Sequence, residues 1–124
     1  MNNIIKQFNE ISIDFLAQTS ILVGSNYLYK YKLMTKVNCI FAIDLFIQKV
    51  LPYKKQILNK DETFFMNKST DMTDYMDDVI GIKQIYHTLD NRSKENIWEI
   101  LLALVYLAEE RFILNNKKNS LVAN

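Results

Sequence analysis

The segment from Lys94 to Leu114 constrains the fold of this chain more than any other feature. Its apolar residues recur at intervals of three or four, so an α-helix would gather them on one broad face. The residues of that face are Ile97, Trp98, Leu101, Leu104, Val105, Ala108 and Phe112. Ile100, Leu102 and Leu107 widen the face until only a narrow polar strip is left. A helix this apolar belongs at the centre of a bundle, with neighbours on nearly every side.

Two earlier segments have the same spacing and predict a helical hairpin. The first seam consists of Ile4, Phe8, Ile11, Phe15, Gln18 and Leu22. The second seam consists of Tyr27, Tyr31, Met34, Asn38, Phe41 and Leu45. Between them, Gly24, Ser25 and Asn26 can close one helix and cap the next, which favours an antiparallel pair. We expect the second helix to continue to Leu51.

Each seam contains one amide, and these amides leave two interpretations open. In the hairpin, Gln18 would lie level with Tyr31. Asn38 would lie level with Ile11, so the two amides would not meet. Buried amides can fix the register of helices or the number of partners. Either both seams face the core of one chain, or one of them faces a second copy or another protein. The alternating pattern at 27–32 also leaves a short strand open as an alternative to a helix.

The rest of the chain is predicted to form shorter elements. Pro52 cannot sit inside a helix without a break, so we expect a short helix over 52–58. Asp61 can cap another short segment that follows it. The acidic stretch 67–78 is predicted to be a loop, and residues 79–89 are predicted to form a helix.

Scarce turn residues support a helical fold as a whole. The chain has only two Gly and one Pro in 124 residues, whereas a sandwich or barrel needs turn residues every ten or so positions. We therefore predict an all-α fold, a compact single-domain bundle of four to five helices. The domain would cover residues 1–114, and residues 115–124 would form a flexible C-terminal tail.

Composition limits the setting and the partners. Fifteen basic and fourteen acidic residues nearly cancel, whereas nucleic-acid-binding domains usually carry a basic excess. The most apolar runs, 37–51 and 97–108, are too short or too polar to span a bilayer, and no signal peptide is visible. We expect a soluble cytoplasmic protein. Cys39 is the only cysteine, so no intrachain disulfide can form, and we expect it to be a small buried side chain.

No pattern typical of catalysis or of cofactor binding is present. Gly24 and Gly81 do not form a glycine-rich phosphate loop. The aspartates within 71–78 lack the spacing and the central glycine of a calcium loop. His87 is predicted to lie on the exposed side of its segment. We therefore predict a protein that is not an enzyme and that binds no cofactor and no metal.

Phe64, Phe65 and Met66 are the candidate contact residues for a protein partner. Three consecutive large apolar residues on one helix cannot all face inward, so at least one is expected at the surface. In the alternative interpretation, this segment plugs the end of the bundle.

A basic and aromatic cluster supplies the alternative function, a nucleic-acid-binding accessory protein. The cluster consists of Tyr27, Tyr29, Lys30, Tyr31, Lys32 and Lys36. Such residues can stack on bases and follow the phosphate backbone. They can equally be packing tyrosines beside solvated lysines.

The order of signals between Phe41 and Ala108 resembles a known group of proteins. Its elements are Val50-Leu51-Pro52, Ile57, Lys60-Asp61-Glu62-Thr63-Phe64-Phe65, an acidic stretch, Ser93-Lys94-Glu95-Asn96-Ile97-Trp98, Leu101, Leu104 and Leu107. This order resembles small helical proteins of unassigned activity encoded by nucleocytoplasmic large DNA viruses, including the mimivirus-like giants. The resemblance implies the cytoplasm of a host cell, or the virion, as the setting.

Together these features lead us to expect a non-catalytic helical module for protein–protein interaction. A role in viral assembly or in contact with the host follows from the resemblance. A protein partner or self-association is expected, and nucleic acid is the less favoured partner.

Overall fold

A computed structural model describes residues 2–67, 69–83 and 85–123. Throughout these ranges the secondary structure is helical and contains no strand, which confirms the all-α prediction. Seven α-helices are described, more than the four to five that we expected.

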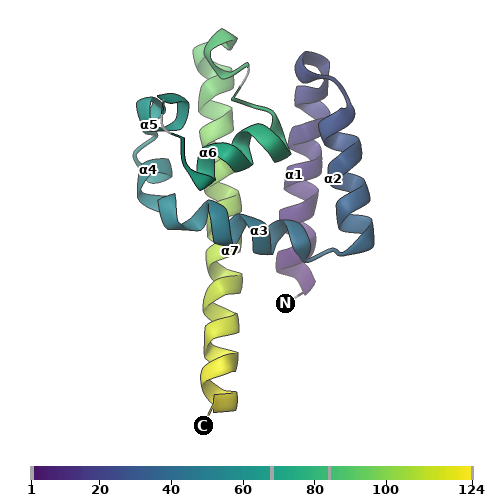
Figure 1. The fold of residues 1–124 in the computed structure, drawn as a ribbon, viewed down its shortest axis with the longest axis vertical. Coiled ribbons are helices and arrows are strands. Elements are labelled where there is room, and N and C mark those ends of the chain that lie inside the picture. The colour runs from purple at the N-terminus through teal and green to yellow at the C-terminus, as the bar shows by residue number, and fades with distance from the viewer. Residues whose placement is uncertain (1, 68, 84, 124) are drawn as a thin grey trace.

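The helices follow one another with short connections. They are α1 (Asn2–Val23), α2 (Asn26–Val37), α3 (Phe41–Lys49), α4 (Lys54–Leu58), α5 (Glu62–Asn67), α6 (Asp71–Tyr75) and α7 (Asn91–Ala123). Leu51–Tyr53 and Tyr86–Thr88 are 3-10 turns, and the π-helical turn Met76–Ile80 continues α6. In Figure 1, α1, α2 and α7 run along the long axis of the molecule, and α3 crosses near the middle of α7.

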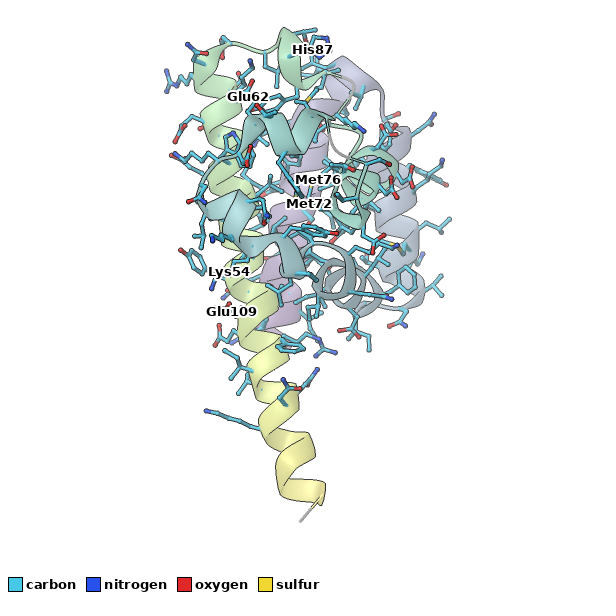
Figure 2. All side chains as sticks on the ribbon, turned by 60° about the vertical axis from the view of Figure 1, so that its left-hand side comes forward. Lys54, Glu62, Met72, Met76, His87 and Glu109 are labelled. Atoms are coloured by element: carbon cyan, nitrogen blue, oxygen red, sulfur yellow. The ribbon has the colours of Figure 1, made fainter. Side chains whose placement is uncertain are left out.

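Helix α7 is central for the first part of its length. Its buried apolar residues are Ile97, Trp98, Leu101, Leu104, Val105 and Ala108. Arg111 is the last buried side chain among those that the structure describes, and Phe112, which we expected on the core face, is exposed. Beyond this point α7 projects past the rest of the molecule (Figures 1 and 2). The helix continues to Ala123, through residues that we expected to form a tail.

Aromatic side chains join the hairpin to the short helices. The rings of Phe8 and Phe46 lie 5.2 Å apart, edge to face, and those of Phe46 and Tyr75 lie 5.5 Å apart in the same geometry. All three side chains are buried, so α1, α3 and α6 share one core. Edge-to-face contacts of this kind add about 0.5–1.5 kcal/mol each beyond the burial of apolar area.

The predicted hairpin is present, and the two amides, whose burial the sequence left open, lie outside the core. Helix α2 excludes the strand alternative at 27–32. The Tyr31 hydroxyl donates a 3.0 Å hydrogen bond to Asn9 Oδ1, and Asn9 Nδ2 donates a 2.9 Å hydrogen bond to the backbone carbonyl of Cys39, so Asn9 links α1 to α2 and to the break that follows it. Gln18 and Asn38 are both exposed. The amides therefore do not occupy the core.

The helix that we expected to run from Tyr27 to Leu51 breaks at Asn38. The backbone of Asn38 is extended (φ −149°, ψ 102°), and its Oδ1 accepts a 3.2 Å hydrogen bond from the backbone N–H of Ile40. Asparagine competes with the helix through local bonds of this kind. A new helix then begins at Phe41 and crosses the molecule instead of continuing along α2.

Residues 71–80 form a buried helical segment where we predicted a loop. Thr70 and Thr73 form a capping box, in which each backbone N–H donates to the other residue's Oγ1, at 2.8 and 3.2 Å. Its buried apolar residues are Met72, Tyr75, Met76 and Ile80. Gly81 ends the segment with a left-handed backbone (φ +71°), so the helix predicted over 79–89 is wrong.

Candidate functional site

The predicted contact segment packs against the body of the molecule. Phe65 is 1% exposed, and its ring lies 5.5 Å from Trp98. The Phe64 ring lies 5.5 Å from that of Tyr53, and both Phe64 and Met66 are half-buried. None of the three is fully exposed, which is the arrangement of the alternative interpretation, a plug at the end of the bundle. As expected, Asp61 caps α5, because its Oδ1 accepts a 3.0 Å hydrogen bond from the N–H of Phe64.

The basic and aromatic cluster is divided by the fold. Tyr31 is 2% exposed, and burial raises the pKa of its hydroxyl well above the usual tyrosine value. Tyr27 is half-buried, with its ring against Gly81. Tyr29 remains exposed, together with the three lysines of the cluster, Lys30, Lys32 and Lys36. The structure therefore leaves one tyrosine on α2 free to stack on a base.

Exposed apolar side chains gather where α2 meets α3, a surface that sequence analysis missed. Leu33 and Val37 lie one turn apart on α2 and are 54% and 83% exposed, and Phe41 begins α3. They border a groove of about 370 Å³. The groove is lined by Lys30, Leu33, Met34, Val37, Asn38 and Phe41. We call this surface the α2–α3 groove.

The α2–α3 groove has an apolar floor, and Lys30 forms its basic edge. Lys32 and Lys36 also belong to α2 but do not line the groove, and α2 has no acidic residue. Within the described part of the chain, none of these lysines forms an ion pair. The groove thus offers apolar contact and positive charge to whatever covers it.

A second exposed stripe follows α7 beyond the core. Tyr106, Ile113 and Leu114 are exposed apolar residues, and Glu110 and Lys117 are exposed charged residues. At 100° per residue, all five fall within about 100° of one another around the helix. We call these five residues the α7 stripe.

Two ion pairs anchor α7 just before it leaves the core. Arg111 Nε lies 2.8 Å from Asp44 Oδ1 on α3, and Lys54 Nζ on α4 lies 2.6 Å from Glu109 Oε2. Figure 2 labels Lys54 and Glu109 at this point. The Arg111 side chain is nearly buried, so its pair is less screened by water than the others. The direction of the projecting end is therefore set by the core.

In the described ranges, no three His, Cys, Asp or Glu side chains lie together so that they could hold a metal ion. His87 is exposed at one end of the molecule, as predicted (Figure 2). Cys39 is exposed, contrary to our expectation, because it lies in the break between α2 and α3.

A small pocket lies between α1, the segment after Gly81 and the start of α7. Its volume is about 170 Å³, and Phe15, Ile82 and Ile97 are among the residues that line it. Gln18 and Asn96 add amide groups, and no titratable side chain takes part. The pocket has apolar surface but no general acid or base.

The fold and these surfaces define an all-helical domain with an exposed apolar groove and a projecting helix. No protein-family model matches the chain, and no match was found to a curated protein or to a solved structure. Among the helices of the described residues, none is both long enough and apolar enough to cross a membrane.

Proposed function

We propose that this protein is a non-catalytic helical module that binds another protein through the α2–α3 groove. The observation that carries the proposal is the joint exposure of Leu33, Val37 and Phe41 along one groove. Single exposed apolar residues are common on protein surfaces, whereas a contiguous group marks an interaction site.

We infer that the partner segment is an amphipathic helix, because such helices bind in apolar grooves. The partner would place its own apolar residues, spaced three or four apart, against Leu33, Val37 and Phe41. Fully burying one large aliphatic or aromatic side chain contributes about 1.5–3 kcal/mol. Three such residues yield a modest affinity once the entropy lost on association is subtracted. Acidic residues on the partner would meet the basic edge at Lys30.

The perturbed pKa values support a non-catalytic role because each has a packing or capping cause. Burial raises the pKa values of Tyr31, Tyr75 and Tyr86, all of which are core residues. The pKa of Asp90 is lowered because its carboxylate accepts a hydrogen bond from the backbone N–H of Ser93 at the start of α7.

The setting proposed for this module rests on the viral resemblance in residues 41–108 alone. A role in viral assembly or in contact with host proteins agrees with a small module that binds through one surface. It would act in the host cytoplasm or in the virion.

The test compares partner capture by two matched variants. Val37→Glu places a charge in the groove, whereas Ile21→Glu places the same charge on an 88% exposed residue of α1 outside it. Circular dichroism should show the wild-type helix content in both. We expect the wild type and Ile21→Glu to retain the same partner in pull-downs, and Val37→Glu to lose it. A protein that captures nothing and is strictly monomeric would overturn the proposal.

A second candidate function, binding of single-stranded nucleic acid, is favoured by one observation. Tyr29, Lys30, Lys32 and Lys36 are all exposed on α2. Affinity that falls steeply with salt and is lost in Lys32→Glu would support it. The absence of a mobility shift at low salt would dismiss it.

A further inference from the structure

We propose that two copies of this chain associate through the α7 stripe, with their projecting helices side by side and antiparallel. This surface is distinct from the α2–α3 groove, so the proposal stands independently of the function proposed above. It assigns an occupant to the projecting end of α7, which extends beyond the core.

The projecting end of α7 has apolar side chains that no other part of the described chain covers. After Arg111 three apolar residues follow in succession, Phe112, Ile113 and Leu114, and they are 39–46% exposed. They point to different sides of the helix, since successive residues are 100° apart. A helix with apolar residues around its circumference is normally buried. An isolated helical end of this length is also marginal in water without packing.

The charges on either side of Ile113 and Leu114 are complementary to those of a second, antiparallel copy. Glu110 precedes Ile113 by three residues, and Lys117 follows Leu114 by three. In an antiparallel pair with its two-fold axis between residues 113 and 114, Glu110 of each copy lies opposite Lys117 of the other. Ile113 of each copy then lies opposite Leu114 of the other. One symmetric contact thus has an apolar centre and an ion pair on each side.

Glu110 and Lys117 are both available to pair with a second copy. Glu110 and Lys117 are exposed, and neither forms an ion pair with any other described residue. They are seven residues apart on one helix, so they are two turns distant and do not pair with each other. Glu109, the neighbouring acidic residue, is already paired with Lys54.

The body of the molecule leaves room for the partner helix along the α7 stripe. The buried residues Leu101, Leu104 and Ala108 lie on the side of α7 that faces away from the stripe. Tyr106 extends the stripe back along the core and is 55% exposed. The projecting end of one copy can therefore lie along the exposed strip of the other. Overlap over 106–121 would be about 24 Å long, which gives a contact at the small end of specific interfaces.

The charge pattern provides the decisive experiment. Glu110→Lys and Lys117→Glu each place like charges opposite one another twice in the dimer, whereas the double variant Glu110→Lys/Lys117→Glu restores both pairs with reversed sign. Glu99→Lys is the matched control, since Glu99 is exposed on the same helix but outside the overlap. The masses are measured by sedimentation equilibrium over a range of concentrations.

We expect the wild type and Glu99→Lys to reach twice the 14.6 kDa of one chain as concentration rises. Each single charge reversal should weaken dimerisation about tenfold or more, and the double variant should recover it. Ile113→Asp should give a monomer of unchanged helix content near the core. A wild type that stays monomeric up to about 1 mM, or a double variant no better than the singles, would overturn the proposal.

Cross-linking tests the axis directly. In a Cys39→Ser background, which removes the exposed native thiol, Ile113→Cys lies beside the two-fold axis. Mild oxidation should link two copies through residue 113, and Ile21→Cys, on α1, should not form that link. Equal linking at both positions would mean that collisions, rather than the α7 stripe, bring the copies together.

Discussion

The indole Nε1 of Trp98 donates a 2.8 Å hydrogen bond to the hydroxyl oxygen of Tyr86. Both side chains are buried, and Phe65 packs against both rings at 5.2 and 5.5 Å. The bond satisfies the indole donor at a place where water cannot reach it, so the large ring can be buried at little polar cost. This cluster joins α7, α5 and the 3-10 turn Tyr86–Thr88.

Trp98→Ala should destabilise the protein by about 3–5 kcal/mol, because it removes a large core side chain and leaves a cavity. Tyr86→Phe should cost about 1–3 kcal/mol, since the indole N–H would stay buried without its acceptor. Urea denaturation measures both free energies of unfolding. In a Trp98→Phe background, the further cost of Tyr86→Phe should fall because the donor is gone. A loss under about 1 kcal/mol for Trp98→Ala would place the indole outside the core.

The two adjacent phenylalanines of α5 should differ in their effect on stability. Phe65→Ala should cost about 3–5 kcal/mol, because the side chain is fully buried against Trp98 and Tyr86. Phe64→Ala should cost under about 2 kcal/mol, since this ring is only half-buried against Tyr53. Chemical denaturation measures both. Equal losses would mean that the two rings are equally buried.

Gly81→Ala should be much more damaging than Gly24→Ala. Both glycines have positive φ angles, +71° and +86°, so each substitution introduces backbone strain of about 1–2 kcal/mol. A Cβ at residue 81 would also lie 2.6 Å from the Tyr27 ring, whereas a Cβ at residue 24 meets nothing within 4 Å. Thermal unfolding should show the larger loss at residue 81, and Tyr27→Ala should relieve part of it. Equal losses at the two glycines would show that the ring can move aside.

Stability should fall in alkaline solution because burial in the core disfavours ionisation of tyrosine hydroxyls. Burial raises the pKa of Tyr31 and of Tyr75, and the nearness of Tyr31 adds to the rise at Tyr75. The protonated hydroxyls are favoured in the folded state, so their contribution is complete below the unfolded pKa of about 10. It is lost as the pH rises from there toward the folded values. Denaturation at a series of pH values should show this slope reduced in Tyr75→Phe and unchanged in Tyr29→Phe, the exposed control.

Helical periodicity and capping residues predicted the long elements because their signals are local. The two seams located α1 and α2, the broad apolar face located α7, and Asp61 caps α5 as the sequence predicted. The same signals failed at Asn38, because the spacing of Met34 and Phe41 continues across the end of α2. Asparagine is found both inside helices and at their ends, so its local hydrogen bond to Ile40 could not be predicted from the sequence.

The prediction of a loop at 71–80 was wrong because the aspartates of this segment alternate with apolar residues that form a buried helical face. Met72, Tyr75 and Met76 are spaced three and four apart, and all are buried. This spacing was available in the sequence and predicts a short helix. The π-helical turn and the left-handed Gly81 that end it were not available, since both depend on the fit against neighbouring elements.

The groove was missed because its residues were divided between two interpretations. Met34 and Phe41 fit the spacing of the predicted core seam, whereas Leu33 and Val37 lie off that seam. An apolar pair four residues apart on the polar face of a helix is the signal that could have found the groove. The sequence predicts that three consecutive large apolar residues cannot all face inward. Only packing determines which of Phe64, Phe65 and Met66 does so.

Helix α7 joins the core and the projecting end without a hinge. Domains joined by a flexible linker sample many relative orientations, whereas here a single rod with one end embedded fixes the other. Whatever lies along the bare end takes a defined angle and distance to the body. The chain therefore acts as a bracket rather than a tether, and it can set the geometry of an assembly as well as its composition.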